Sequence, residues 1–167
     1  MHIRKTTPSD LDDLVRIYDI ARKFMIDNGN PTQWGTDWPN MDKLLEYTKS
    51  NGYVVVDVSD KVVASFGLFK NADELSYKTI DGAWLNNSPY GVVHTLASDG
   101  SIKGVTKLVL DFALKECGNI KVDTHASNTK MLHILNKDNW HYCGKINIAE
   151  KGYNGDTERL AFQKIKS

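Results

Sequence analysis

Apolar residues recur at the spacing of an α-helix over several stretches of the chain. In the first stretch they lie three or four positions apart, at Leu11, Leu14, Val15, Tyr18, Ala21, Phe24 and Met25. This spacing predicts an amphipathic helix that begins at a capping box formed by Ser9 and Asp12 and ends at Asn28-Gly29. The same reasoning predicts further helices over residues 41–50, 104–118 and 128–136.

Elsewhere the apolar positions alternate or form short runs, which predicts β-strands. The expected strands are residues 2–6, 53–59, 61–70, 92–97, 119–124, 140–148 and 160–166. Residues 71–91 are rich in Asn, Asp, Gly and Ser and have no clear period, so we expect a loop with room for one short strand. Hairpins in the first half favour antiparallel pairing, and strand–helix–strand order in the second half favours a parallel crossover. The pattern predicts an α/β (α+β) fold: a mixed central sheet of about six to seven strands with about four helices on both faces.

Length and composition are those of one ordinary globular domain. The chain has 167 residues, 41% hydrophobic and 25% charged, with no internal repeat and no linker rich in Pro or Gly. We therefore expect residues 1–167 to form a single domain. The 21 basic and 21 acidic side chains give zero net charge. Binding of nucleic acid or of a membrane surface is not expected, because both favour a basic excess.

No targeting or membrane-spanning segment is predicted. The first residues, MHIRKTTPSD, alternate polar and apolar positions and lead directly into the first helix, unlike a signal or transit peptide. No apolar run approaches the ~20 residues that cross a bilayer. Cys117 and Cys143 are expected to be free thiols in a reducing compartment. Together these features predict a cytoplasmic protein.

The segment from Val92 to Ala113 is the most informative one for chemistry. It reads as a strand, a turn that contains Gly100 and Gly104, and a helix that begins at or just after Gly104. A helix N-terminus offers unpaired backbone N–H groups, and glycine lets a phosphate approach them closely. The turn can therefore hold a pyrophosphate, although both glycines are equally compatible with an ordinary turn.

The residues of this turn resemble the acetyl-CoA loop of the GNAT acetyltransferases. That loop has the pattern Gln/Arg-x-x-Gly-x-Gly/Ala; here it reads Ser101-Ile-Lys-Gly104-Val-Thr106, which keeps the central glycine and differs at both flanking positions. The stretch IRKTTPSDLDDLVRIYDIARKFM resembles the first strand and helix of the family. Asn128, Lys137 and Trp140 match or nearly match its second cofactor segment, Asn-x-x-Ala-x-x-x-Tyr-x-Lys-x-Gly-Phe.

The resemblance implies the GNAT fold and direct transfer of an acetyl group from acetyl-CoA, as co-substrate, to an amine of a small molecule or peptide. It implies that the backbone of Leu96, Ala97 and Ser98 pairs with the pantetheine arm as an added strand. It implies that the phosphates lie on Ser101, Ile102, Lys103, Gly104, Val105 and Thr106. Asn128 is expected near the pantetheine or thioester, and a helix N-cap is an alternative role that can hold at the same time.

The two altered loop positions and one further substitution suggest an alternative function. The family's frequent general acid, the tyrosine of the second segment, is replaced here by Leu135. The chain could therefore be a catalytically weak module of the same fold that binds or senses acyl-CoA. A protein of this fold in which the loop binds nothing is a third possibility. The sequence leaves open whether the chain is a monomer or a homodimer.

Two residues are candidates for proton transfer. His94 lies on the central strand two residues before the expected pantetheine contact, and its reference pKa near ~6.5 suits a general base. Tyr142 on a later strand is the nearest phenol in sequence to Leu135 and is a candidate acid. Either side chain could instead be structural, as a hydrogen-bonded histidine or a core aromatic.

The loop NPTQWGTDWPN, between the first two helices, is the candidate acceptor site. Gln33, Trp34 and Trp38 could hold a cationic amine by cation–π attraction, or the tryptophans could simply cover the helix packing. Trp84 and Tyr90, in the long loop before the central strand, are further candidates. No metal is expected, because His125, His133, His141 and Cys143 do not have the spacing of a zinc motif.

Overall fold

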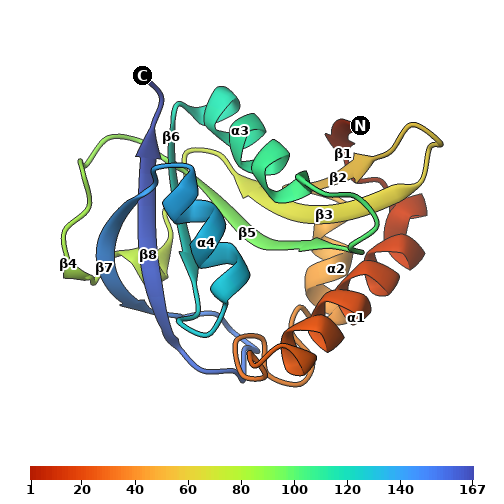
Figure 1. The fold of residues 1–167 in the computed structure, drawn as a ribbon, viewed down its shortest axis with the longest axis horizontal. Coiled ribbons are helices and arrows are strands. Elements are labelled where there is room, and N and C mark those ends of the chain that lie inside the picture. Colours follow the sequence, from red (N-terminus) through yellow and green to blue (C-terminus); the bar gives the residue numbers. More distant parts are fainter.

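The structure, a computed structural model, describes residues 1–167, and its strands form one mixed sheet (Figure 1). The eight strands are β1 (His2–Lys5), β2 (Gly52–Val56), β3 (Val62–Phe69), β4 (Asp81–Gly82), β5 (Gly91–Ser98), β6 (Asn119–Thr124), β7 (His141–Asn147) and β8 (Glu158–Ile165). Their order across the sheet is β1-β2-β3-β5-β6-β8-β7-β4. Only β5 and β6 pair in parallel. The predicted fold class is confirmed, with one strand more than expected because the two-residue β4 forms within the long loop.

Helices cover both faces of the sheet, as predicted (Figure 1). They are α1 (Leu11–Asp27), α2 (Met41–Tyr47), α3 (Val105–Cys117) and α4 (Thr129–Lys137). α1 and α2 pack on one face, and α3 and α4 pack on the other. α1 buries one stripe of residues spaced three and four apart, namely Leu14, Ile17, Tyr18 and Ala21. Phe24, which the pattern placed in this stripe, is 48% exposed, because the buried stripe is centred on Ile17.

The start of α1 differs from the predicted capping box at Ser9 and Asp12. The carboxylate of Asp10 accepts a hydrogen bond from the backbone N–H of Thr7 at 2.8 Å. The same carboxylate pairs with Arg4 on β1, also at 2.8 Å. This second partner explains the shift, because Asp10 can satisfy the backbone and bind the first strand at once.

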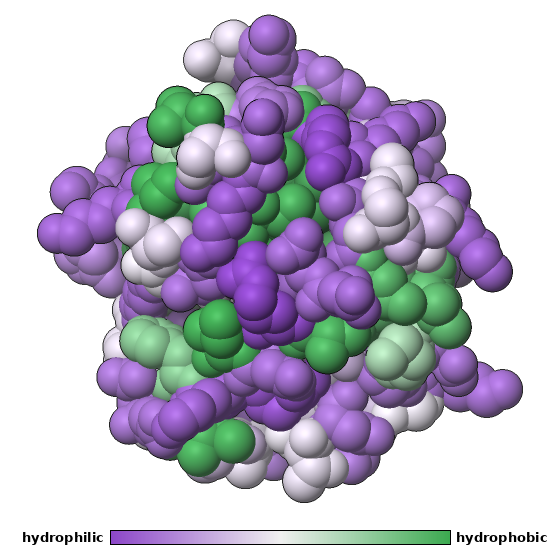
Figure 2. Space-filling model, turned by 90° about the vertical axis from the view of Figure 1, so that its right-hand side faces the viewer, coloured by the Kyte–Doolittle hydropathy of each residue, from purple (hydrophilic) through white to green (hydrophobic).

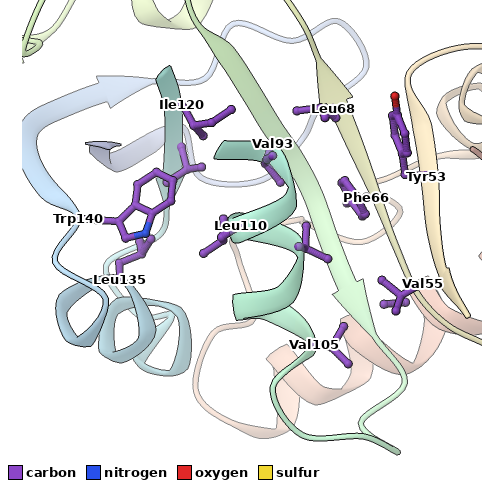
Figure 3. Packing of buried hydrophobic residues seen from close by; sticks show 14 of the residues in the cluster. Tyr53, Val55, Phe66, Leu68, Val93, Val105, Leu110, Ile120, Leu135 and Trp140 are labelled. Carbon is purple, nitrogen blue, oxygen red and sulfur yellow. The ribbon is translucent and has the colours of Figure 1, made fainter. Parts of the chain in front are cut away.

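The largest apolar cluster lies between the sheet and the helices α3 and α4 (Figure 3). Phe66 of β3, Leu110 of α3 and Ile120 of β6 are almost fully buried in it. Leu135 of α4 and Trp140, just before β7, close the cluster on its far side (Figure 3). Because well-packed interiors tolerate little change in volume, this cluster fixes the positions of α3 and α4 relative to β5.

The sheet opens between its two central strands. β5 and β6 pair only at Gly91–Ile120 and Val92–Lys121, and the rest of β5 has no partner on that edge (Figure 1). On its other edge β5 carries a β-bulge, because the register with β3 shifts at Thr95. Thr95 has a φ of 50°, which a β-branched residue adopts only when its surroundings hold it there. The unpaired edge that faces β6 and the β-bulge that faces β3 therefore lie on opposite edges of the same part of β5.

The outer surface carries apolar groups in small separate patches. Figure 2 shows the side of the molecule where β1, β3 and α1 lie, with polar side chains between these patches. No helix combines the length and the apolar character needed to cross a membrane.

Candidate active site

Two cavities adjoin where β5 and β6 part. The larger, of about 130 Å³, is lined by residues of α2, β5 and the segment between β7 and β8; we call it the aromatic cavity. The smaller, of about 50 Å³, is lined by residues of β5, α3 and α4; we call it the helix-side cavity. Both are lined by Gln33, Trp34, Val93, Thr95 and Asp123. Groups bound in the two cavities would therefore meet at this shared wall.

The helix-side cavity combines apolar side chains with the amides of Asn128 and Gln33. Leu96 of β5, Leu110 of α3 and Met131 of α4 contribute apolar surface. Asn128 caps α4, since its side chain accepts a hydrogen bond from the N–H of Met131 at 3.2 Å. Its amide nitrogen also donates to the side chain of Gln33 at 3.2 Å. The N-cap role of Asn128 is confirmed, and the same side chain lines the cavity.

The turn between β5 and α3 is held in place by Asp99. Its carboxylate accepts hydrogen bonds from the backbone N–H and the hydroxyl of Ser101, at 2.9 and 2.5 Å. Arg16 and Lys61 contact the same carboxylate at 3.1 and 3.3 Å. Burial alone would raise the pKa of Asp99, but these donors outweigh it and lower the pKa to about 2. The turn is therefore anchored by an aspartate that stays ionised.

The beginning of α3 offers free backbone donors. The N–H groups of residues 102–107 form no hydrogen bond within the chain. Gly100 and Gly104 have φ values of 78° and 82°, in the left-handed region that glycine adopts without strain. A Cβ atom built at Gly104 would meet no atom within 4 Å. The mouth of α3 is thus open, and both its charge and its geometry suit an anion.

His94 lies in the wall of the aromatic cavity and forms a pair with Glu74. Its Nε2 lies 2.8 Å from the Glu74 carboxylate, and its ring packs edge-on against Phe69 at 5.5 Å. Burial alone would lower the pKa of His94, but the hydrogen bond to Glu74 and the charge of Asp123 outweigh it and raise the pKa. Both side chains are partly accessible, at 25% and 18%. A proton on this histidine can therefore exchange with a group in the cavity.

A hydroxyl network holds the bulge of β5. The hydroxyl of Tyr18 donates to the carbonyl oxygen of Thr95 at 2.8 Å. The hydroxyls of Tyr47 and Thr95 lie 2.5 Å apart. Burial raises the pKa of Tyr47 well above its usual value, so this phenol stays protonated. The hydroxyl of Thr95 therefore lies at the wall that the two cavities share, with a protonated phenol behind it.

The aromatic cavity is closed by two loops that Arg159 joins. Its guanidinium donates to the carbonyl oxygens of Gln33 and Asp156 and to the hydroxyl of Tyr153. Its Nε lies 3.7 Å from the carboxylate of Asp123. The loop between α1 and α2 and the loop between β7 and β8 are thereby fixed against each other (Figure 1).

Only some of the residues proposed from the sequence lie at these cavities. Gln33, Trp34 and Trp38 line the aromatic cavity with His94. The backbone of Leu96, Ala97 and Ser98 lies on the edge of β5 that β6 leaves unpaired. Residues 101–106 form the open turn. Gln33, Trp34, Trp38, His94 and Leu96 therefore meet at the two cavities, whereas residues 97, 98 and 101–106 line neither of them.

Three of the proposed aromatic residues lie away from both cavities. Tyr142 is 49% exposed, and its ring packs on Phe162 of the neighbouring strand. Trp84 and Tyr90 hold the ammonium of Lys121 between their rings, at 4.2 and 3.9 Å from the ring centres. The geometry gives no support to an acid role for Tyr142 or to acceptor contacts by Trp84 and Tyr90, because each ring has its own structural partner.

Sequence reasoning missed several residues of the aromatic cavity, namely Lys43, Tyr47, Glu74, Asp123, Glu150, Tyr153 and Arg159. Asp123 carried one usable signal, an acid directly after Val122 near the carboxyl end of the strand NIKVDT. Glu74 carried none, since it lies in a loop without periodicity. Groups of three or more His, Cys, Asp or Glu residues that could hold a metal ion do not occur in the structure.

Comparisons with known proteins were made by sequence and by structure. No family model matches the sequence, and no curated protein matches it. A GNAT-family acetyltransferase from Streptococcus agalactiae has 26% sequence identity and a TM-score of 0.86, over 99% of this chain and 95% of that one. An acetyltransferase from Staphylococcus aureus has 20% identity and a TM-score of 0.69, over 99% of both chains.

A third solved structure carries a bound co-substrate. This phosphinothricin acetyltransferase from Sinorhizobium meliloti, in complex with AcCoA, has 10% identity and a TM-score of 0.65. The alignment covers 99% of this chain and 88% of that one. The resemblance inferred from the sequence is confirmed: the chain has the GNAT acetyltransferase fold, and bacterial GNAT-family acetyltransferases are among its structural neighbours.

Proposed function

We propose that the chain is an N-acetyltransferase that moves an acetyl group from acetyl-CoA directly to an amine of a small molecule or peptide. The observation that carries this proposal is the junction of the two cavities on β5: Leu96, which lines the smaller cavity, precedes the open turn with its free N–H groups, and a histidine–glutamate pair faces the larger cavity. Residues 1–167 act as a single domain, in the cytoplasm, as a monomer or homodimer.

Acetyl-CoA is held along β5 and the mouth of α3. The free N–H groups of residues 102–107 and the helix dipole bind the phosphates, and Lys103 adds positive charge. The unpaired backbone edge of residues 96–98 aligns the pantetheine arm as an added strand would. Asn128 lies beside this path. Acetyl-CoA supplies the activated thioester, and the chain's own groups orient it and manage the protons.

His94 takes the proton from the amine. A protonated amine cannot attack a thioester, so a base must accept a proton before or during attack. Glu74 holds the imidazole in place and favours its protonated form after the transfer. Attack then forms the C–N bond, while a backbone N–H at the bulge of β5 stabilises the oxyanion.

The departing thiolate needs a proton in turn. Tyr142 remains a candidate from the sequence, but its side chain lies outside both cavities. We propose instead that the C–S bond breaks as the thiolate receives the proton that His94 took from the amine, which returns His94 to its neutral form, while the Thr95 hydroxyl, held by the Tyr47 phenol at 2.5 Å, donates a hydrogen bond to the sulfur. The Leu135 side chain cannot help, since it is fully buried in the core.

A binding module without turnover is the second candidate function. It is favoured by one observation: Leu135 occupies the position of the family's frequent acid and packs in the core. An acetyl-CoA titration, followed by a thiol-release assay over a panel of amines, distinguishes the two functions. Turnover of an amine supports the enzyme. Tight binding of acetyl-CoA without thiol release for any amine supports the module.

A further inference from the structure

Resting on the proposed function, we infer that the acceptor is a primary amine on an apolar or aromatic body that carries no carboxylate. The inference follows from the wall of the aromatic cavity. That wall has aromatic rings and three carboxylates against the two permanent cations Lys43 and Arg159, and both cations are already paired within the chain.

Aromatic rings form much of this wall. Trp38 and Tyr153 meet edge to face at 5.9 Å, and Tyr47 and Phe69 lie 6.4 Å apart. Trp34 adds a fifth ring at the wall shared with the helix-side cavity. Rings fixed in this way contact an apolar body over a large area. The Lys43 ammonium already lies over the rings of Trp38 and Tyr47, at 5.7 and 5.9 Å from their centres, so the rings serve mainly the apolar body of a ligand. The size of the cavity, about 130 Å³, suits a small molecule.

Three carboxylates face the same space. Glu74 pairs with His94, and Asp123 accepts a hydrogen bond from Tyr77 at 2.6 Å. Glu150 is 38% exposed in its side chain and forms the outer part of the wall. These acids attract an ammonium group on its way to His94, and they repel any second anion in the ligand.

The basic groups of the wall are not available to a ligand carboxylate. Arg159 directs its donors to backbone carbonyls, to Tyr153 and toward Asp123. Lys43 lies 2.8 Å from Glu46 and 3.3 Å from Glu150. A ligand carboxylate would have to break one of these pairs or remain unpaired among acids, and both are costly in a partly buried site. An α-amino acid is therefore a poor acceptor.

Matched acceptor pairs that differ in the carboxylate test this inference. The pairs are phenethylamine with phenylalanine, tyramine with tyrosine, and isoamylamine with leucine, each assayed for kcat/KM by thiol release. We expect each amine to exceed its amino acid by at least about tenfold. Amino-acid methyl esters, which keep the branched carbon without the charge, should recover most of this loss. Amino acids used within about threefold of their amines would overturn the inference.

A binding measurement separates this inference from the proposed function. Quenching of tryptophan fluorescence, with CoA present, gives the dissociation constant of each acceptor, because Trp34 and Trp38 line the cavity. Tighter binding of the amines without thiol release would uphold the inference and refute the proposed enzyme. Equal or tighter binding of the amino acids would refute the inference, whatever the turnover.

A charge variant sharpens the test. Glu150→Gln removes one acid from the wall and frees Lys43 from one of its two partners. We expect this variant to lower the ratio of kcat/KM for the amine to kcat/KM for the amino acid by about threefold or more. Glu158→Gln makes the same change on β8 outside the cavity, where Glu158 pairs with Lys145, and should leave the ratio unchanged. Equal ratios in the wild type and both variants would overturn the assigned role of the acids.

Discussion

The turn before α3 is made by neighbouring residues of one segment, whereas the wall of the aromatic cavity is made by residues far apart in the chain. In the turn, two glycines and Asp99 leave a row of N–H groups free. In the wall, Arg159 of β8 donates to the backbone of Gln33, which is 126 positions away in the chain. The turn is open, and the anion binding that we propose for it depends on its unpaired backbone N–H groups. The wall is cross-linked, and the ligand preference that we propose for it depends on basic groups that are already paired within the chain.

The largest expected effect comes from blocking the turn. Gly104→Glu places a carboxylate at the free N–H groups and forces a left-handed residue to carry a side chain. Cofactor affinity should fall by at least about 1,000-fold, because the new anion competes with the phosphates for the same donors. Isothermal titration with acetyl-CoA measures it.

Gly100→Glu is the matched control for the turn. Gly100 has almost the same φ, and a Cβ there also meets no atom within 4 Å. It precedes the row of free N–H groups, so cofactor affinity should change by no more than about threefold. Equal affinity in both variants would show that the phosphates bind elsewhere.

Breaking the wall should cost stability. Arg159→Met removes the donors to Gln33, Tyr153 and Asp156 and leaves Asp123 without its nearby cation. We expect the free energy of unfolding to fall by about 3 kcal/mol, as for one partner lost from a buried charge network. Urea denaturation followed by circular dichroism measures this change.

Arg22→Met is the matched control for the wall. Arg22, whose side chain is 17% exposed, donates to the carbonyl oxygen of Trp38 and pairs with Asp19, whose side chain is 68% exposed. Its loss should cost no more than about 1 kcal/mol. A similar loss in both variants would mean that Arg159 has no special bridging role.

The contrast between these regions also explains how far the sequence could be interpreted. The helices and strands could be predicted because their hydrophobic period is local, and the turn because Gly100 and Gly104 flank a strand–helix boundary. The capping box at α1 was misplaced by two residues, since the deciding partner of Asp10 is Arg4 on another element. Features that depend on neighbouring residues could therefore be predicted from the sequence, whereas contacts between residues on different elements could not.

The same limit applies to the candidate site. Tyr142 was nominated because it is near Leu135 in sequence, but the β-strand directs its ring to Phe162. Trp84 and Tyr90 were nominated as aromatic loop residues, but the fold uses them to enclose Lys121. Residue type suggested a role in each case, but the packing partner of each ring depends on contacts that only the fold creates.

Removing the proposed base should slow turnover without weakening the cofactor. His94→Ala deletes the imidazole from the wall but leaves the turn at Gly104 untouched, so kcat should fall by about 100-fold. The dissociation constant of acetyl-CoA should stay within about twofold. His133→Ala, on the exposed side of α4, is the matched control and should keep full activity. Wild-type turnover in His94→Ala would remove this residue from the mechanism.

The smallest expected effect is a pH dependence carried by the same histidine. The pKa of His94 is raised above its usual 6.5, because the hydrogen bond to Glu74 outweighs the effect of burial. Folding therefore favours the protonated form, and this contribution to stability is complete below about pH 6 and lost as the pH rises through the raised pKa. Catalysis needs the neutral imidazole, so kcat/KM should rise over the same interval in which stability falls.

Glu74→Gln tests whether the rise in kcat/KM and the fall in stability both follow the titration of His94. Without the carboxylate, the pKa of His94 should fall, so the rise in kcat/KM should move to lower pH and the loss of stability over that interval should shrink. Rate profiles and urea midpoints between about pH 5.5 and 9, for the wild type and the variant, measure both changes. A profile that keeps its midpoint in Glu74→Gln would show that a group other than His94 controls the rate.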